Sequence, residues 1–249
     1  MKLIIHSRHN PCLCHALLES VERSHTPCTT AVLYEAGDDP AQRGYALVAE
    51  RFHVPLTRIA AADFRTALTR ELADGREPFT CLAEDGILFR RRLFINNAEA
   101  ALHDPRTAAF SQRLSPAIAV PPPPRFIFQA FQSRRHWQKW QWGDGVADWG
   151  LPFAFDGSLY RTAQLLALFR EAAGDRQDVD LTGAAASLWR SLPLMACGNE
   201  QTAIRVSHEF TTERLTEIYN DGDALAIGPI CNLLVNVPAF GIDLSFTPW

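Results

Sequence analysis

The amino-terminal part of the chain alternates between short apolar runs and longer amphipathic segments. Residues 2–7 carry three consecutive aliphatic side chains, which is typical of a buried strand. A helix is predicted directly after it, because Asn10 can cap a first turn and Pro11 suits the first helical position. Apolar residues then recur on one face of that helix, at Leu13, Leu17, Leu18 and Val21. The pattern predicts a strand, a tight turn and an amphipathic helix.

The same unit of strand and helix recurs along the next part of the chain. Strands are predicted at 29–34 and 54–59, the second near a sheet edge because it contains a proline. Amphipathic helices are predicted from Asp39 and after Asp63, and a fourth strand at 79–83. Alternation at this spacing indicates right-handed crossovers, and hence an α/β fold with a mainly parallel sheet flanked by helices.

The second half of the chain has a less regular pattern, which predicts a mixed architecture. Further strands are expected at 108–114, 125–131, 194–197 and 203–206. Further helices are expected at 158–173, 182–192 and 212–219. A length of 249 residues is within the range of one large α/β domain, so we expect a single domain.

Composition and charge narrow the function classes. The chain is 47% hydrophobic with a formal net charge of -4, so it has no basic excess with which to bind a nucleic acid. The first ten residues lack the apolar stretch of a signal peptide, and no later stretch is long enough to span a bilayer. We therefore predict a soluble cytoplasmic protein without a transmembrane segment, with peripheral membrane attachment left open.

Polar residues follow two of the predicted strands, where ligands of parallel sheets bind. Ser7 and Arg8 end the first strand, and Arg8 suits a diphosphate or the edge of a uracil-type base. Glu84, Asp85 and Gly86 end the fourth strand. A hard divalent cation that bridges phosphates needs such carboxylates on a rigid strand end, and glycine lets the backbone approach the ligand. The alternative is a solvated turn, because aspartate-glycine is a common turn pair.

The order of these elements, with the segment 79–86, resembles the nucleotide-binding half of the GT-A glycosyltransferases, in the nucleotide-diphospho-sugar transferase superfamily. The segments 110–114 and 148–162 are similar to blocks of a bacterial group of family 2-like glycosyltransferases of unassigned substrate. In the family an acidic motif at the fourth strand binds a divalent metal and the sugar-nucleotide diphosphate, and the matching residues here are Glu84 and Asp85. The chain departs from the family pattern because no second aspartate follows Gly86.

The resemblance implies a glycosyltransferase of the hexosyltransferase type. Residues 1–86 would form the nucleotide-binding half and residues 87–249 the acceptor-side half. The donor would be a nucleotide-diphosphate sugar held with Mn²⁺ or Mg²⁺, and the acceptor a glycan or a lipid-linked sugar. The nucleotide-sugar ligands would include Ser7, Arg8, Glu84, Asp85 and Gly86, and the metal ligands would be Asp85 and Glu84.

Asp156 is the predicted catalytic base, with Asp148 in reserve. Asp156 precedes the predicted helix 158–173, whose positive end would keep the carboxylate ionised. In inverting members of the family, an acid of the second half deprotonates the acceptor hydroxyl. The alternative is that Asp156 is only the cap of the helix.

Trp149 and Gly157 are the predicted acceptor-binding residues. Trp149 lies in a stretch of four tryptophans with nearby acids, and indole faces pack well on sugar rings. The alternative is a loop held in place by packed aromatic side chains.

Other enzyme classes lack their motifs. The chain contains no G-x-x-x-x-G-K-[ST] loop, no G-x-G-x-x-G after the first strand and no G-x-S-x-G elbow. Two rivals to the transferase remain. One is a non-catalytic protein on the same fold that binds a nucleotide or a partner, and the other is a sugar nucleotidyltransferase, whose glycine-rich phosphate loop is missing here.

Overall fold

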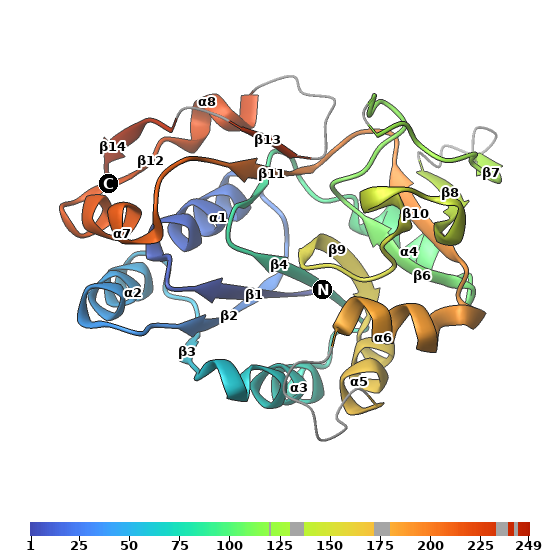
Figure 1. Cartoon of the computed structure of the whole chain (residues 1–249), viewed down its shortest axis with the longest axis horizontal. Helices are drawn as coiled ribbons and strands as arrows, with labels where there is room; N and C mark the ends of the chain where they lie inside the picture. Colours follow the sequence, from blue (N-terminus) through green and yellow to red (C-terminus); the bar gives the residue numbers. More distant parts are fainter. Residues whose placement is uncertain (120, 130–136, 172–179, 233–238, 242–243) are drawn as a thin grey trace.

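The computed structural model describes the whole chain except residues 120, 130–136, 172–179, 233–238 and 242–243 (Figure 1). Nine of the described strands form one mixed sheet. In sheet order they are β3 (Leu56–Arg58), β2 (Thr29–Glu35), β1 (Lys2–Arg8), β4 (Phe79–Glu84), β9 (Asp156–Arg161), β6 (Thr107–Ser111), β10 (Leu194–Gly198), β8 (Trp137–Gln141) and β7 (Phe128–Gln129).

The directions of the strands bring several carboxyl ends together at one edge of this sheet. β1 runs parallel to β2 and β4, and β2 runs parallel to β3. β9 lies antiparallel between β4 and β6, so β6 and its parallel neighbour β10 point the same way as β4. The carboxyl ends of β1, β2, β4, β6 and β10 therefore share one edge of the sheet with the amino end of β9. The predicted α/β class with a mainly parallel sheet is confirmed, and the second half is mixed.

Helices cover both faces of the sheet, as the two buried clusters show. One face carries α1 (Pro11–Arg23), α2 (Asp39–Phe52), α4 (Ile95–Leu102), α7 (Thr212–Asn220) and α8 (Ile227–Asn232). The other face carries α3 (Phe64–Asp74), α5 (Thr162–Glu171) and α6 (Leu181–Leu188). Two small sheets complete the described part: β13 (Ala239–Gly241) with β11 (Ala203–Ser207) and β5 (Ile87–Phe89), and β12 (Asp223–Leu225) with β14 (Phe246–Pro248).

The start of α1 confirms the local prediction. The side chain of Asn10 accepts a hydrogen bond from the backbone nitrogen of Leu13 at 3.1 Å, and Pro11 occupies the first turn. His9 turns the chain from β1 into this helix with a φ of 56°, in the left-handed region where histidine is enriched. The predicted helix after Asp63 also forms, although Asp63 makes no side-chain cap bond because a short 3₁₀ turn precedes the helix.

The predicted helix 158–173 is wrong in its first turn. Residues up to Arg161 belong to β9, and α5 starts only at Thr162. The register pairs Ser158 with Leu82 and Tyr160 with Thr80, and the side chains of β9 are almost all buried. Pairing with β4 and burial on both faces outweigh the local helical pattern. Asp156 consequently starts a strand and does not cap a helix.

The second half contains elements that the sequence pattern did not reveal. These are β5, β8, β9, α4, β12, α8, β13 and β14. The predicted strand 125–131 is represented by β7 alone, and its last two residues lie outside the described part of the chain. No helix in the described part combines the length and apolar character needed to cross a membrane.

The tryptophan-rich stretch is part of the core. Trp140 and Trp149 have no exposed surface, and their rings meet edge to face with centroids 5.0 Å apart. Trp140 Nε1 donates to the carbonyl oxygen of Trp149 at 2.9 Å, and Trp149 Nε1 donates to that of Pro121 at 3.1 Å. The prediction that Trp149 binds an acceptor is therefore corrected: its ring faces are covered, and it holds the loop before β9 on the sheet.

We expect Gly44→Ala to destabilise the protein. A Cβ at Gly44 in α2 would lie 2.4 Å from Cγ of Pro11, whose ring is rigid. Overpacking of this kind costs about 1–3 kcal/mol, more than the roughly 1 kcal/mol by which alanine favours a helix over glycine. Urea denaturation measures the difference. Gly143→Ala is the control, because a Cβ there meets nothing within 4 Å, and equal stability of the two variants would contradict the prediction.

Candidate functional site at the carboxyl edge of the sheet

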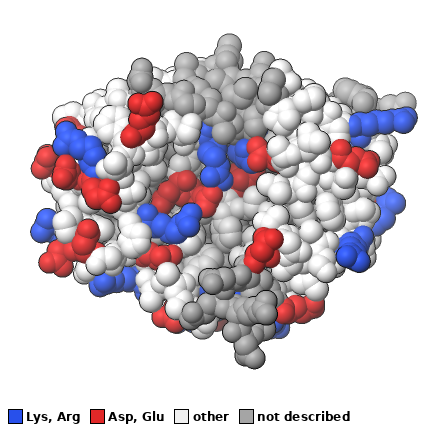
Figure 2. Space-filling model, viewed as in Figure 1, with Lys and Arg blue, Asp and Glu red and all other residues white. Residues whose placement is uncertain are grey.

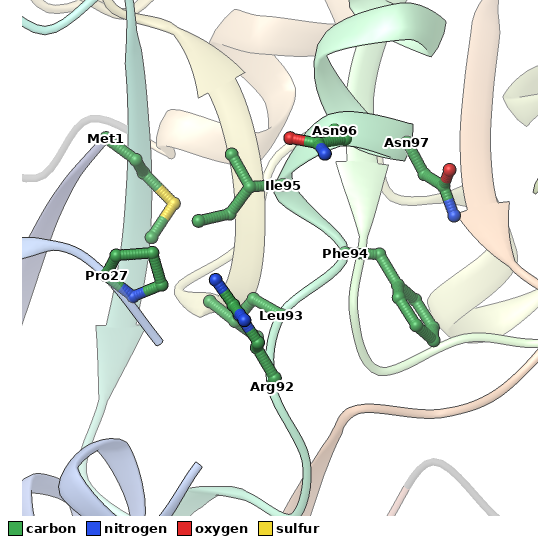
Figure 3. Close-up of a pocket in the computed structure, with 8 residues that line it drawn as sticks. All are labelled: Met1, Pro27, Arg92, Leu93, Phe94, Ile95, Asn96 and Asn97. Carbon is green, nitrogen blue, oxygen red and sulfur yellow. The ribbon is translucent and has the colours of Figure 1, made fainter. Parts of the chain in front are cut away.

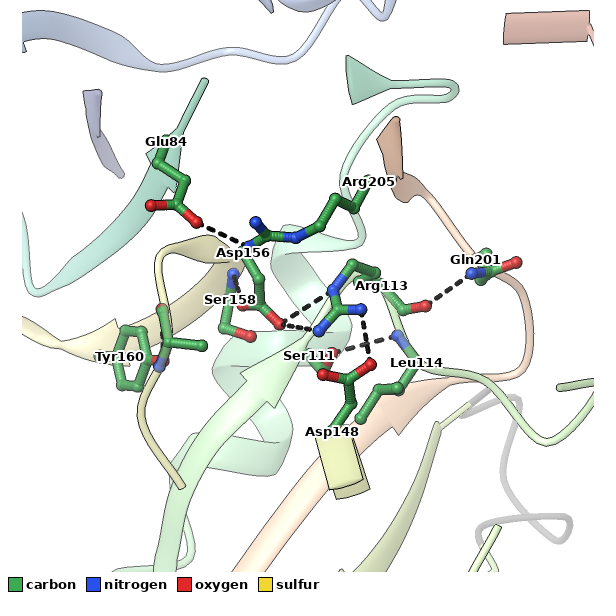
Figure 4. A network of polar contacts seen from close by, with 11 residues as sticks. Glu84, Ser111, Arg113, Leu114, Asp148, Asp156, Ser158, Tyr160, Gln201 and Arg205 are labelled. Carbon is green, nitrogen blue, oxygen red and sulfur yellow. Dashed lines mark hydrogen bonds and ion pairs between the residues drawn. The ribbon is translucent and has the colours of Figure 1, made fainter. Parts of the chain in front are cut away.

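Charged side chains from distant parts of the sequence meet at the carboxyl edge of the main sheet (Figure 4). Glu84 ends β4, and the register places Ala83 beside Asp156 at the start of β9. Arg113 follows β6 by two residues, and Arg205 extends from β11. Figure 2 shows acidic and basic side chains gathered together in the middle of this face, over the ends of β1 and β4.

Arg113 lies between two carboxylates in the inner part of this edge. Its Nη2 is 3.2 Å from Oδ2 of Asp156, and its Nη1 is 2.9 Å from Oδ2 of Asp148. Arg113 and Asp156 are both buried, with 3% and 4% of their surface exposed. The backbone nitrogen of Ser158 donates to Oδ1 of Asp156 at 3.1 Å, and Gln201 donates to the carbonyl oxygen of Arg113 at 2.7 Å. The inner network is thus paired and held in place.

This pairing changes the role expected for Asp156. Burial acts to lower the pKa of Arg113, but Asp156 and Asp148 outweigh it and raise that pKa, so the guanidinium stays charged. The hydrogen bond from Arg113 lowers the pKa of Asp148. Asp156 is buried and ion-paired, and it begins a strand instead of preceding a helix, which does not suit a general base. Asp148 keeps 30% of its side chain exposed and is the more exposed of the two acids.

Glu84 lies between two arginines in the outer part of the edge. Its Oε1 is 2.7 Å from Nη2 of Arg205, and its Oε2 is 3.5 Å from Nη2 of Arg8. The arginine side chains stay accessible, at 37% exposed for Arg205 and 61% for Arg8. Both oxygens of Glu84 therefore contact a cation, while both arginines keep surface for a ligand.

Asp85 points back into the protein. The backbone nitrogen of Arg8 donates to its Oδ2 at 2.6 Å, and its Oδ1 is buried with no hydrogen-bond partner in the described structure. Burial raises the pKa of Asp85 to about 7, against the lowering effects of the Arg8 amide and the Ser7 hydroxyl. Asp85 thus ties the end of β1 to the turn after β4.

Two glycines of the predicted site have structural contacts. Gly86 has a φ of 84°, and its carbonyl oxygen accepts from the backbone nitrogen of Val206 at 2.8 Å. Gly157 is buried, and a Cβ there would lie 3.2 Å from the ring of Phe89. The prediction that Gly157 binds an acceptor is corrected, because it packs inside the protein.

Ser7 is likewise part of the interior. It has no exposed surface, and its hydroxyl lies 2.5 Å from that of Tyr45 in α2. The prediction that Ser7 contacts a nucleotide is corrected, because alternation along β1 turns it toward the helices. Glu35 at the end of β2 supports the same loop from the other side, since its carbonyl oxygen accepts from the backbone nitrogen of His9 at 2.9 Å.

The carboxylates do not fit the predicted Mn²⁺ or Mg²⁺ site. No group of three or more histidine, cysteine, aspartate or glutamate residues in the described part of the chain can hold a metal ion. Both oxygens of Glu84 are paired with arginines, and Asp85 uses Oδ2 on a backbone amide. A hard cation needs several oxygens that face one open position, and the described residues of this edge do not present them.

A cavity of about 500 Å³ adjoins Arg8. It is lined by Arg8 and His9 after β1, by the start of α2 and by α7, and the lining includes the acids Asp38, Glu213 and Glu217. Helix amino termini favour anionic groups, although Asp38 and Thr211 already cap α2 and α7 with their side chains. The cavity offers room for part of a ligand whose charged group lies on the arginines.

A second cavity of about 460 Å³ lies at the opposite edge of the sheet (Figure 3). Met1 and Pro27, near the amino ends of β1 and β2, line it together with the segment 92–97. Ligands of parallel sheets bind at the other edge, so this cavity is not the candidate site.

Arg113 and Arg205 are the site residues that sequence reasoning missed. Both lie inside or directly after segments predicted as strands, 108–114 and 203–206. An arginine within an otherwise apolar strand indicates that an acidic partner lies nearby, because a buried arginine is normally paired. The identity of that partner required the spatial arrangement.

Comparisons with known proteins support the fold. No family model matches the chain, and no curated protein matches it. The structure of residues 1–349 of TarS from S. aureus in complex with UDP superposes with a TM-score of 0.51 at 8% identity, covering 88% of this chain and 65% of that TarS segment. The same TarS segment in another crystal structure gives 0.47 at 9% identity, with 82% and 59% covered. The chain thus spans less than two thirds of these TarS segments.

A third similar structure is 4-diphosphocytidyl-2C-methyl-D-erythritol synthase from Anaerococcus prevotii DSM 20548, with a TM-score of 0.47, 9% identity, and 88% and 96% of the two chains covered. The predicted GT-A-like fold is confirmed by the arrangement of the sheet and by the superposition on the UDP-bound TarS segment at a TM-score of 0.51.

We expect Arg113→Met to destabilise the protein strongly. The substitution leaves Asp156 buried without its cation, which typically costs about 3–5 kcal/mol. Arg106→Met is the control, because Arg106 forms an exposed ion pair with Asp104 and such pairs contribute little to stability. Urea denaturation at neutral pH measures both. A loss for Arg113→Met no larger than that of the control would contradict a structural role for this network.

We expect Asp85→Asn to remove a pH-dependent loss of stability. Folding raises the pKa of Asp85 from 3.8 to about 7, so between these values the native state holds a proton that the unfolded chain has lost. Stability therefore falls as pH rises through this range, and asparagine mimics the protonated form. Thermal denaturation should show that the Tm of the variant rises relative to that of the wild type as the pH increases from 4.5 to 8. A constant difference across this range would contradict the assignment.

Proposed function

We propose that this chain is a transferase that binds a nucleotide-diphosphate sugar at the carboxyl edge of its sheet and moves the sugar to an acceptor. The observation that carries the proposal is the convergence of Arg8 and Arg205, both accessible, on Glu84, with a cavity of about 500 Å³ beside Arg8. Guanidinium groups suit phosphate oxygens, and the GT-A-like fold places its ligands at this edge. The UDP complex of TarS, a protein of similar fold, supports a nucleoside diphosphate as part of the ligand.

Asp148 is the proposed base of the hexosyltransferase reaction. In a single displacement the acceptor oxygen bonds to the anomeric carbon, the bond from that carbon to the diphosphate breaks, and the diphosphate leaves with the electron pair. The hydroxyl proton passes to a carboxylate. Asp148 has the exposed side chain that this step needs, whereas Asp156 is 4% exposed.

A second candidate is a non-catalytic protein that binds a nucleotide on the same fold. Arg113 neutralises Asp148 and Asp156 together, and its hydrogen bond lowers the pKa of Asp148. A lowered pKa makes a carboxylate a weaker base. This observation favours binding without transfer.

Calorimetry tests ligand binding. We expect one of UDP, CDP, GDP or ADP to bind the full chain in the micromolar range. The matching nucleoside triphosphate is tested in parallel, because a nucleotidyltransferase would prefer it. Absence of binding to all four diphosphates, with and without Mn²⁺, would remove the proposed function.

Hydrolysis of a donor sugar nucleotide distinguishes the transferase hypothesis from the hypothesis of a non-catalytic binding protein. We expect slow release of the nucleoside diphosphate by the wild type and a loss of at least ten-fold in Asp148→Asn, with the affinity for the diphosphate preserved. Asp144→Asn, in the same loop, is the control. Tight binding with no donor turnover by the wild type would favour the non-catalytic candidate.

A further inference from the structure

The outer ion pairs point to a way of holding phosphate that differs from the metal site expected from the resemblance. Glu84 is the end residue of β4 and is 22% exposed, so it faces the edge where a ligand would lie. Each of its two oxygens is in contact with a different arginine, at 2.7 Å for Arg205 and 3.5 Å for Arg8. The arginines come from separate elements and converge on this one carboxylate.

We propose that Arg8 and Arg205 bind the diphosphate directly by exchanging Glu84 for phosphate oxygens, so that nucleotide binding does not require a divalent cation. The inference rests on the proposed function, because it assigns the diphosphate of that ligand to these residues. It concerns only how the ligand is held and involves no change in covalent bonds.

The charge balance of the edge supports this inference. Within the network of Figure 4 and the adjoining Arg8, the guanidinium and carboxylate groups are equal in number. They are Arg8, Arg113 and Arg205 on one side and Glu84, Asp148 and Asp156 on the other. A divalent cation is attracted by uncompensated carboxylates, whereas each of these three acids already faces an arginine.

The orientation of Asp85 supports it independently. Asp85 directs Oδ2 to the backbone nitrogen of Arg8 at 2.6 Å, so it fixes the main chain that carries the Arg8 side chain. A carboxylate used in this way positions a phosphate-binding arginine and is turned away from a ligand-borne cation. Asp85 and Glu84 therefore hold Arg8 at two points, one on its backbone and one on its side chain.

The exchange is physically reasonable because the outer pairs are partly exposed. Ion pairs at such positions contribute little to stability, so replacing the carboxylate by phosphate costs little. A diphosphate offers more oxygens than a carboxylate and can bond to both guanidinium groups at once. The cavity beside Arg8 leaves room for the rest of the nucleotide.

Calorimetry on the full chain tests the inference with UDP, CDP, GDP and ADP, each in EDTA and in Mn²⁺. We expect the diphosphate that binds to do so in EDTA with a Kd within about three-fold of its value in Mn²⁺. Arg205→Gln should weaken binding in EDTA at least ten-fold, because one charged phosphate contact is lost. Arg106→Gln is the matched control, since Arg106 is an exposed, ion-paired arginine at the amino end of β6, on the opposite edge.

Glu84→Gln gives the sharpest distinction, because the two ways of holding phosphate predict opposite signs. If Glu84 competes with phosphate for the arginines, its neutral variant binds the diphosphate a few-fold more tightly in EDTA. If Glu84 is a metal ligand, the variant binds more weakly in Mn²⁺. Thermal denaturation of each variant shows that it is folded.

The outcomes separate the inference from the proposed function. Binding that appears only with Mn²⁺, or that weakens in Glu84→Gln, overturns direct recognition by arginine while leaving a nucleotide-binding site. Unchanged affinity in Arg205→Gln also overturns it. Failure of all four diphosphates to bind in both buffers overturns the inference together with the proposed function.

Discussion

The insertion of β9 between β4 and β6 is the constraint on which the candidate site depends. As an antiparallel strand, it brings its first residue, Asp156, to the edge where its neighbours end. A carboxylate buried there needs a buried cation, and Arg113 supplies it while also reaching Asp148. The loops that follow β6 and precede β9 are thereby tied to the end of β4, and the edge has a defined shape without a ligand.

This constraint divides the charges of the edge into two layers. The inner layer, around Arg113, is desolvated and paired, so its ion pairs hold strands and loops together. The outer layer, around Glu84, keeps accessible guanidinium groups on Arg8 and Arg205. Position relative to solvent, more than residue type, separates the side chains that organise the protein from those that can contact a ligand.

The first half of the chain was predictable because its elements are specified by nearby residues. Asn10 caps α1 from within three residues, and the alternation of apolar strands with amphipathic helices identifies the parallel sheet. The first turn of the predicted helix 158–173 was wrong because its structure is specified by residues far away in the sequence. Its residues pair with β4, more than seventy positions earlier, and that pairing leaves no local signal.

The sequence by itself determined the class of fold and the edge at which Arg8, Glu84 and Asp85 end their strands, because strand order and direction follow from local periodicity and short connections. The tertiary structure decided which way these side chains point and what they pair with. Ser7 and Trp149 are buried, and Arg205 from β11 reaches Glu84. Burial and ion pairing depend on neighbours that folding brings together from distant parts of the chain. The composition and residue spacing of a single segment do not reveal which neighbours those are.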